Sequence, residues 1–161
     1  MRSIGSDLGA LTGRDRDLGL QAGEVALAPL SALGEVPVGG AMVTPAGGLD
    51  AAFLIHVVLR SREEAVSEAT VRRAFLNGLR QATEWGIETL AASALGTGAG
   101  NLDIETSARV MTEVLEAHLT TWALPRELSI LTWTDYEEDT FATAVEGLPG
   151  SLKPGGGEAE E

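Results

Sequence analysis

Three glycines at alternate positions, Gly96, Gly98 and Gly100, mark the segment of this chain best suited to binding a small anion. They follow an apolar run at residues 87–92 that is typical of a strand, and they precede a helical pattern that begins near Asp103. Glycine leaves backbone N–H groups accessible, and the start of a helix carries partial positive charge. Open α/β sheets also bind ligands beyond the carboxyl ends of their strands. The loop therefore predicts a phosphate site, with a purely structural turn as an equal alternative.

Other familiar site chemistries fit this chain poorly. A P-loop needs a lysine after its glycines, and a dinucleotide-binding fingerprint needs a differently spaced third glycine and an acidic residue ending a later strand. There is no cysteine, and the two histidines are far apart, so we expect neither a metal nor a cofactor. His56 lies in an apolar strand, which favours a hydrogen-bonded core histidine over a catalytic base. His118, near the end of a helix, is expected at the surface or at the rim of a site.

The charge of the chain restricts its partners. The 11 Lys and Arg residues face 24 Asp and Glu residues, for a net charge of −13 at pH 7. Nucleic acids and anionic membranes need a basic surface, so neither is expected as a partner, whereas backbone amides can still bind a small anion. The N-terminal residues do not resemble a signal peptide, and the longest apolar stretch, residues 51–59, is too short to span a bilayer. We therefore expect a cytoplasmic location.

The order of the elements predicts an α/β domain with helices covering a largely buried sheet. Residues 51–59 are apolar on both alternating faces, which indicates a central strand. The expected strands are residues 38–44, 51–59, 87–92 and 127–133, and the expected helices are residues 67–85, one opening near Asp103 and one capped by Asp135 with Glu138 completing a capping box. The domain core is expected at residues 35–148, with an irregular segment of the same domain at 1–34 and a disordered acidic tail at 149–161.

Two separated motifs resemble the macro domain family, which binds ADP-ribose. They are GGAMVTPAGGLDAAFLIHVVL at residues 39–59 and LAASALGTGAGNLD at residues 90–103, and the similarity covers roughly residues 36–133. The resemblance implies a three-layer α/β/α sandwich with a mixed sheet. It also implies that the glycine loop wraps the diphosphate, with Thr97 adding a hydroxyl donor and Ala99 facing the ligand. The ligand-binding residues that it implies are Gly96, Thr97, Gly98, Ala99, Gly100, Asn101, Trp133 and Tyr136, the two aromatics packing against adenine or ribose or else completing the core.

The chain also departs from the family pattern at its beginning. It has no counterpart of the family's first strand with its Gly-Asp, and the asparagine-rich ribose loop has only residues 2–13 near its place, which contain no Asn. The expected function is therefore an ADP-ribose-binding module, and no catalytic residue is assigned. An ADP-ribosyl hydrolase and a non-binding structural domain stay alternatives. In the last case the exposed edge left by the absent strand would promote self-association.

Overall fold

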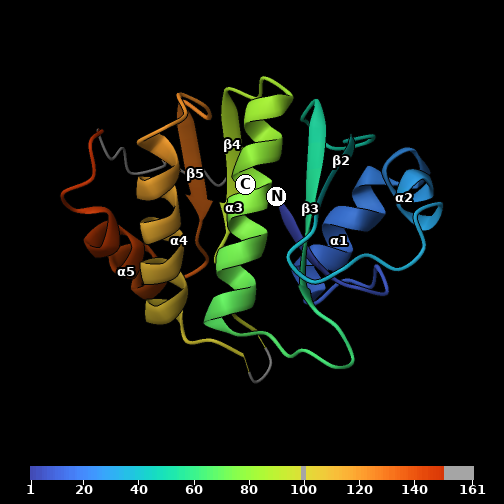
Figure 1. The fold of residues 1–161 in the computed structure, drawn as a ribbon, viewed down its shortest axis with the longest axis horizontal. Coiled ribbons are helices and arrows are strands. Elements are labelled where there is room, and N and C mark those ends of the chain that lie inside the picture. The colour runs from blue at the N-terminus through green and yellow to red at the C-terminus, as the bar shows by residue number, and fades with distance from the viewer. Residues whose placement is uncertain (99–100, 151–161) are drawn as a thin grey trace, which may run out of the picture.

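The computed structural model describes residues 1–98 and 101–150 and shows an α/β/α fold with a mixed sheet (Figure 1). Its elements are β1 (Arg2–Gly5), α1 (Gly13–Ala22), α2 (Glu24–Ser31), β2 (Ala41–Pro45), β3 (Phe53–Arg60), α3 (Glu68–Glu84), β4 (Thr89–Ser93), α4 (Ile104–Leu119), β5 (Glu127–Leu131) and α5 (Asp135–Val145). In Figure 1, α3 and α4 lie in front of the strands, whereas α1 and α2 lie beside β2 and β3. No helix of residues 1–98 and 101–150 is long and apolar enough to cross a membrane.

The strands form two hydrogen-bonded groups that β1 brings together. One group has the order β1-β3-β2, with β3 parallel to β1 and antiparallel to β2, and the other is the parallel pair β4-β5. The amino group of Met1 donates to the carbonyl oxygen of Ala91 at 2.6 Å, so the beginning of β1 reaches β4. The strand expected to be central, β3, has a partner on each side.

The main core lies between α3, α4 and the strands. Val71, Phe75 and Leu79 are fully buried on one face of α3 and pack in the same cluster as Ile55 and Val57 of β3. Three- and four-residue spacing places such side chains on one face of a helix. Ser67, the first residue of the helix expected at 67–85, caps α3 by accepting a hydrogen bond from the Thr70 N–H at 3.3 Å. The expected helix is therefore present, and its apolar face packs on the sheet.

The first 34 residues are not irregular, in contrast to the expectation from sequence. They form β1, α1 and α2, and β1 is buried along its whole length. Four residues are too few for a strand pattern to show, and Gly19 lowers the helical propensity of α1. A Cβ at Gly19 would lie 2.8 Å from the Arg2 guanidinium, so a side chain there would displace Arg2 from its buried position. Tertiary packing of Arg2 therefore accounts for a small residue at position 19.

Two local expectations were also wrong. Thr134, not Asp135, caps α5, accepting a hydrogen bond from the Glu137 N–H at 3.2 Å, so the cap lies one residue earlier than the pattern with Glu138 suggested. His118 is only 2% exposed rather than at the surface. Its Nε2 lies 2.8 Å from the carbonyl oxygen of Leu124, because the chain after α4 folds back over the end of that helix.

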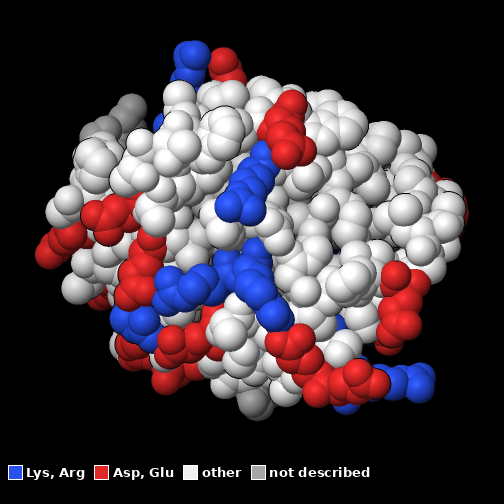
Figure 2. Space-filling view, in the orientation of Figure 1, with Lys and Arg blue, Asp and Glu red and all other residues white. Residues whose placement is uncertain are grey.

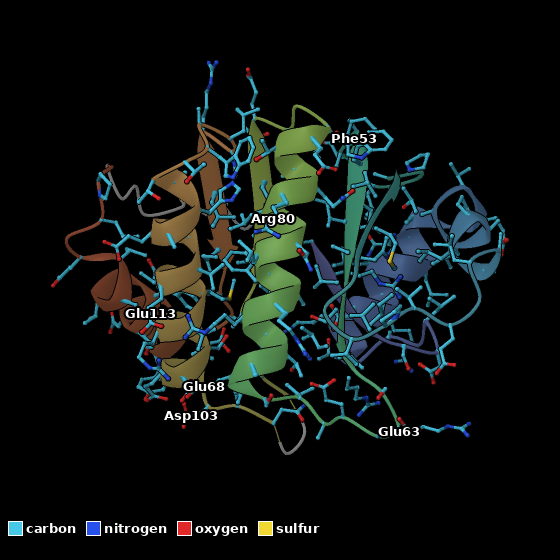
Figure 3. All side chains as sticks on the ribbon, viewed as in Figure 1. Phe53, Glu63, Glu68, Arg80, Asp103 and Glu113 are labelled. Atoms are coloured by element: carbon cyan, nitrogen blue, oxygen red, sulfur yellow. The ribbon has the colours of Figure 1, made fainter. Side chains whose placement is uncertain are left out.

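The outer surface of α3 and α4 carries ion pairs that join the two helices. Arg72 lies 2.6 Å from Glu113, and Arg109 lies 2.6 Å from Glu68. Figure 2 shows basic side chains in the middle of this face with acidic side chains around them, and Figure 3 labels Glu68 and Glu113. The partners are about half exposed, so water screens these charges and the apolar core remains the main source of stability.

A buried polar cluster joins β1 to its neighbours. His56 is fully buried, with Nδ1 3.2 Å from a guanidinium nitrogen of Arg2 and Nε2 2.9 Å from Oγ1 of Thr44. Because the guanidinium can only donate, Nδ1 accepts and the proton of the neutral ring lies on Nε2. Burial, and with it the positive charges of Arg2 and of the amino terminus, lowers the pKa of His56 to about 3. The prediction of a core histidine is confirmed.

This cluster predicts a specific loss of stability in acid. Between pH 6.5 and about 3 the unfolded chain binds a proton at His56 that the folded chain does not, so the free energy of unfolding falls as pH falls. His56→Gln removes this proton uptake. The stability difference between wild type and H56Q should therefore narrow by about 1.4 kcal/mol per pH unit below 6.5. Urea denaturation at pH 7, 5 and 4 measures it, and a difference independent of pH would contradict the assignment.

Candidate functional site

A cavity of about 510 Å³ lies where the start of α1 meets the ends of β4 and β5. This is the carboxyl end of both strands, the position at which α/β sheets bind ligands. Three chain segments far apart in sequence meet there. The cavity is lined by Ser3, Thr12, Gly13, Arg14, Asp15, Ser93, Ala94, Thr97, Gly98, Trp133 and Glu137.

The glycine loop after β4 forms one wall. Gly98 has φ +141°, a conformation that side chains disfavour, and a Cβ there would lie 3.3 Å from the Thr12 side chain. Gly96 has φ +79° and faces α3, where a Cβ would come within 2.6 Å of the Val71 side chain. The Leu102 N–H donates to the carbonyl oxygen of Gly96 at 2.9 Å and holds the loop closed. Glycine is therefore required at both positions, at Gly96 for packing on α3 and at Gly98 for approach to α1.

The first turn of α1 forms the opposite wall. Thr12 caps the helix, since its Oγ1 accepts from the Asp15 N–H and its carbonyl oxygen accepts from the Arg16 N–H, each at 3.1 Å. No hydrogen bond joins the N–H groups of Gly13 and Arg14 to another residue of the described chain. Both residues are exposed and line the cavity. The wall therefore offers free N–H donors at the positive end of a helix dipole.

Asp15 holds this wall in place. Its carboxylate is buried and accepts hydrogen bonds from the Ser3 N–H at 2.9 Å and from the Thr12 hydroxyl at 2.7 Å. The Asp15 carbonyl oxygen accepts from Nε of Arg2 at 2.8 Å. Burial lowers the pKa of Arg2, while the carboxylate of Asp15 opposes that shift. Asp15 thus fixes β1 and the start of α1 relative to each other.

An aromatic ring and a cation lie together at the cavity. The Arg14 guanidinium stands over the Trp133 ring at 3.5 Å from its centroid, and Trp133 is 47% exposed. The backbone N–H of Trp133 donates to Oε2 of Glu137 at 2.8 Å, which orients the segment after β5. Backbone donors, one cation and one flat apolar face suit a ligand that combines an anion with a ring.

Only part of the residue set predicted from sequence meets at this cavity. Thr97, Gly98 and Trp133 line it, and Gly96 supports the loop from behind. The Thr97 hydroxyl donates to the carbonyl oxygen of Ala94 at 3.1 Å, so its proton is already used within the loop. Asn101 and Tyr136 are exposed and are not among the lining residues, and Ala99 and Gly100 lie outside the described residues.

Sequence reasoning missed the wall built by α1. Thr12, Gly13 and Arg14 lie in the segment expected to be irregular, and Glu137 is not among the site residues expected from sequence. A usable signal was present, because Thr12 followed three residues later by Asp15 matches the pattern of a capped helix start. In residues 1–98 and 101–150, no three His, Asp or Glu side chains gather as metal ligands.

Solved structures and curated relatives resemble this chain. A crystal structure of the macro domain of ganglioside induced differentiation associated protein 2 aligns with a TM-score of 0.78 at 20% identity, covering 94% of this chain and 77% of that one. A macrodomain mutant of Oceanobacillus iheyensis with ADPR aligns with a TM-score of 0.73 at 17% identity, covering 91% of this chain and 82% of that one. At these identities the comparison shows a shared fold.

Curated relatives are similar over parts of their length. A macro domain-containing protein of Caldanaerobacter subterraneus subsp. tengcongensis is 26% identical over 117 residues, which are 71% of this chain and 66% of that protein. An O-acetyl-ADP-ribose deacetylase of Escherichia fergusonii is 30% identical over 97 residues, which are 59% of this chain and 55% of that protein. The chain thus spans less than two thirds of the length of these relatives. The profile of the Macro domain family matches residues 13–111, more than half of the sequence. The chain belongs to the macro domain family.

Proposed function

We propose that this domain binds ADP-ribose, with the diphosphate held between the start of α1 and the glycine loop. The observation that carries the proposal is the close approach of the two walls, since a Cβ on Gly98 would already touch Thr12. Free N–H groups of Gly13 and Arg14 and the side-chain-free surface of Gly98 then face one cavity. Backbone donors at a helix start bind phosphate without net positive charge, which is compatible with the acidic composition.

The Trp133 ring and the Arg14 guanidinium also complement such a ligand. Trp133 offers a partly exposed ring on which a base or a ribose can pack, and Arg14 supplies a cation next to it. The structurally similar Oceanobacillus iheyensis macrodomain mutant contains ADPR, which supports ADP-ribose over other nucleotide diphosphates as the ligand. Arg14 would exchange its contact with the ring for one with a phosphate oxygen when the ligand enters.

Removal of an ADP-ribosyl or acetyl group is the second candidate function, and the relative named O-acetyl-ADP-ribose deacetylase favours it. The two carboxylates at the cavity, Asp15 and Glu137, both accept hydrogen bonds from backbone N–H groups. Both oxygens of Asp15 already accept hydrogen bonds that hold the wall together, whereas Glu137 accepts at Oε2 only and leaves Oε1 available to a water molecule. A hydrolytic reaction would rest on a water molecule positioned by the substrate.

Ligand binding should raise the melting temperature of the protein. ADP-ribose at about 100 times its Kd should stabilise the fold by ~2.7 kcal/mol, or roughly 5–10 °C for a domain of this size. Adenosine, which lacks the diphosphate, should give a far smaller shift. Differential scanning fluorimetry measures both, and isothermal titration calorimetry confirms the stoichiometry. Unchanged melting and no heat at millimolar ADP-ribose would overturn the proposed function.

A further inference from the structure

Glu137 is the acidic residue of the candidate site whose carboxylate still has an oxygen to offer to a ligand. It lies in the first turn of α5, just after the chain leaves β5 (Figure 1), and it lines the cavity, whereas Asp135 and Glu138 of the same turn do not. Its Oε2 accepts from the Trp133 N–H at 2.8 Å, which sets the direction of the carboxylate. Within the described residues no hydrogen bond reaches its Oε1, while both oxygens of Asp15 are already engaged.

Trp133 brings two opposite charges to the same cavity. The Arg14 guanidinium stands over its ring, 3.5 Å from the centroid, and the Glu137 carboxylate binds its backbone N–H. The start of α1 adds the free N–H groups of Gly13 and Arg14, whereas a carboxylate offers only acceptor atoms. The cavity therefore has a donor side at the start of α1 and an acceptor side at the start of α5.

The two sides suit different parts of one ligand. Phosphate oxygens accept hydrogen bonds and bind cations and backbone N–H groups, so a diphosphate belongs on the donor side. A ribose is bonded directly to each end of that diphosphate in ADP-ribose, and its hydroxyl groups can donate to a carboxylate. A phosphate on the same ribose would instead bring a second negative charge to Glu137. In dinucleotide-binding folds, a carboxylate in this role selects a free ribose hydroxyl, and an arginine accommodates the phosphorylated one.

We propose that Glu137 is a specificity-determining residue, which accepts a hydrogen bond from a ribose hydroxyl of the ligand and disfavours ligands with a phosphate on that ribose. The inference rests on the proposed function, because the diphosphate must lie between α1 and the glycine loop for a ribose to reach α5. A purely structural role would limit Glu137 to orienting the segment after β5 through Trp133. The two roles differ in one measurable quantity, the ratio of the affinities for free and phosphorylated ribose.

Glu137→Gln separates the two roles. The side-chain amide oxygen can still accept from the Trp133 N–H, so the local structure is kept, while the atom that faces the ligand becomes a neutral donor. Glu138→Gln is the matched control, because Glu138 is the next residue of the same helical turn, is exposed and does not line the cavity.

Calorimetric titration with three ligands measures the ratio. They are ADP-ribose, ADP-ribose 2′-phosphate, which is phosphorylated on the adenosine ribose, and ADP-ribose 1″-phosphate, which is phosphorylated on the distal ribose. Wild type should bind at least one of the phosphorylated ligands about tenfold or more weakly than ADP-ribose, because like charges repel in a partly shielded site. E137Q should reduce this ratio by about fivefold or more, and E138Q should leave it unchanged. The disfavoured phosphate identifies the ribose that lies beside Glu137.

The possible failures point to different conclusions. Equal affinity of the wild type for all three ligands would contradict the role of Glu137 and leave the proposed function standing. The same holds for a ratio that E137Q shares with wild type, since Glu137 would then only orient Trp133. If wild type bound none of the three ligands, the proposed function itself would be overturned, and the role of Glu137 with it.

Discussion

Replacing Gly98 with valine is expected to reduce ADP-ribose affinity by at least about 100-fold, because a branched side chain would fill the space between the two walls of the site. A Cβ at Gly98 lies 3.3 Å from Thr12, so the two added methyl groups must point toward the free N–H groups of α1 or displace that helix start. Calorimetric titration with ADP-ribose measures the loss, and circular dichroism establishes that the variant is folded.

Gly150→Val is the matched control for backbone strain. Gly150 has φ +149°, close to the +141° of Gly98, but a Cβ there meets nothing within 4 Å. Both variants therefore carry similar conformational strain, of about 1–3 kcal/mol, and only one obstructs the site. G150V should bind as wild type does. A folded G98V with undiminished affinity would remove the glycine loop from the site.

Asp15→Ala should give the largest loss of stability among single substitutions of the polar residues described above. It leaves the Ser3 N–H without its acceptor, removes the partner of the Thr12 hydroxyl and takes away the negative charge that favours the charged form of Arg2. The hydrogen bond from Arg2 to the Asp15 backbone carbonyl remains. Each buried group left without its partner costs about 1–3 kcal/mol. Urea denaturation without ligand measures the effect, which keeps it separate from any change in binding.

Asp17→Ala is the control for loss of an acidic side chain from the same helix. Asp17 is exposed, so its removal should change the free energy of unfolding by less than about 0.5 kcal/mol. Asp15→Asn then separates charge from hydrogen bonding, since an amide oxygen can still accept from Ser3. If D15A were as stable as D17A, the cluster would contribute nothing to holding β1 against α1.

Local patterns in the sequence were sufficient for the elements that hold the core. The helix expected at residues 67–85 and the doubly apolar strand expected at residues 51–59 correspond to α3 and β3, because the side chains that mark each element lie within a few residues of each other. The glycine loop was read correctly as a turn between a strand and a helix, and Trp133 lies at the cavity with it. These features depend on periodicity and capping, which are short-range properties of the chain.

Tertiary structure alone decided how the first 34 residues fold and what faces the glycine loop. α1 contains Gly19 because Arg2 packs against it, and Arg2 is buried because it contacts Asp15 and, 54 positions along the chain, His56. The Arg14 contact with Trp133 likewise joins the start of α1 to the segment after β5. Contacts between such distant segments leave no periodic pattern in the local sequence. The sequence by itself therefore determined the fold class and one wall of the site, whereas the opposite wall follows from burying a charged cluster between distant segments.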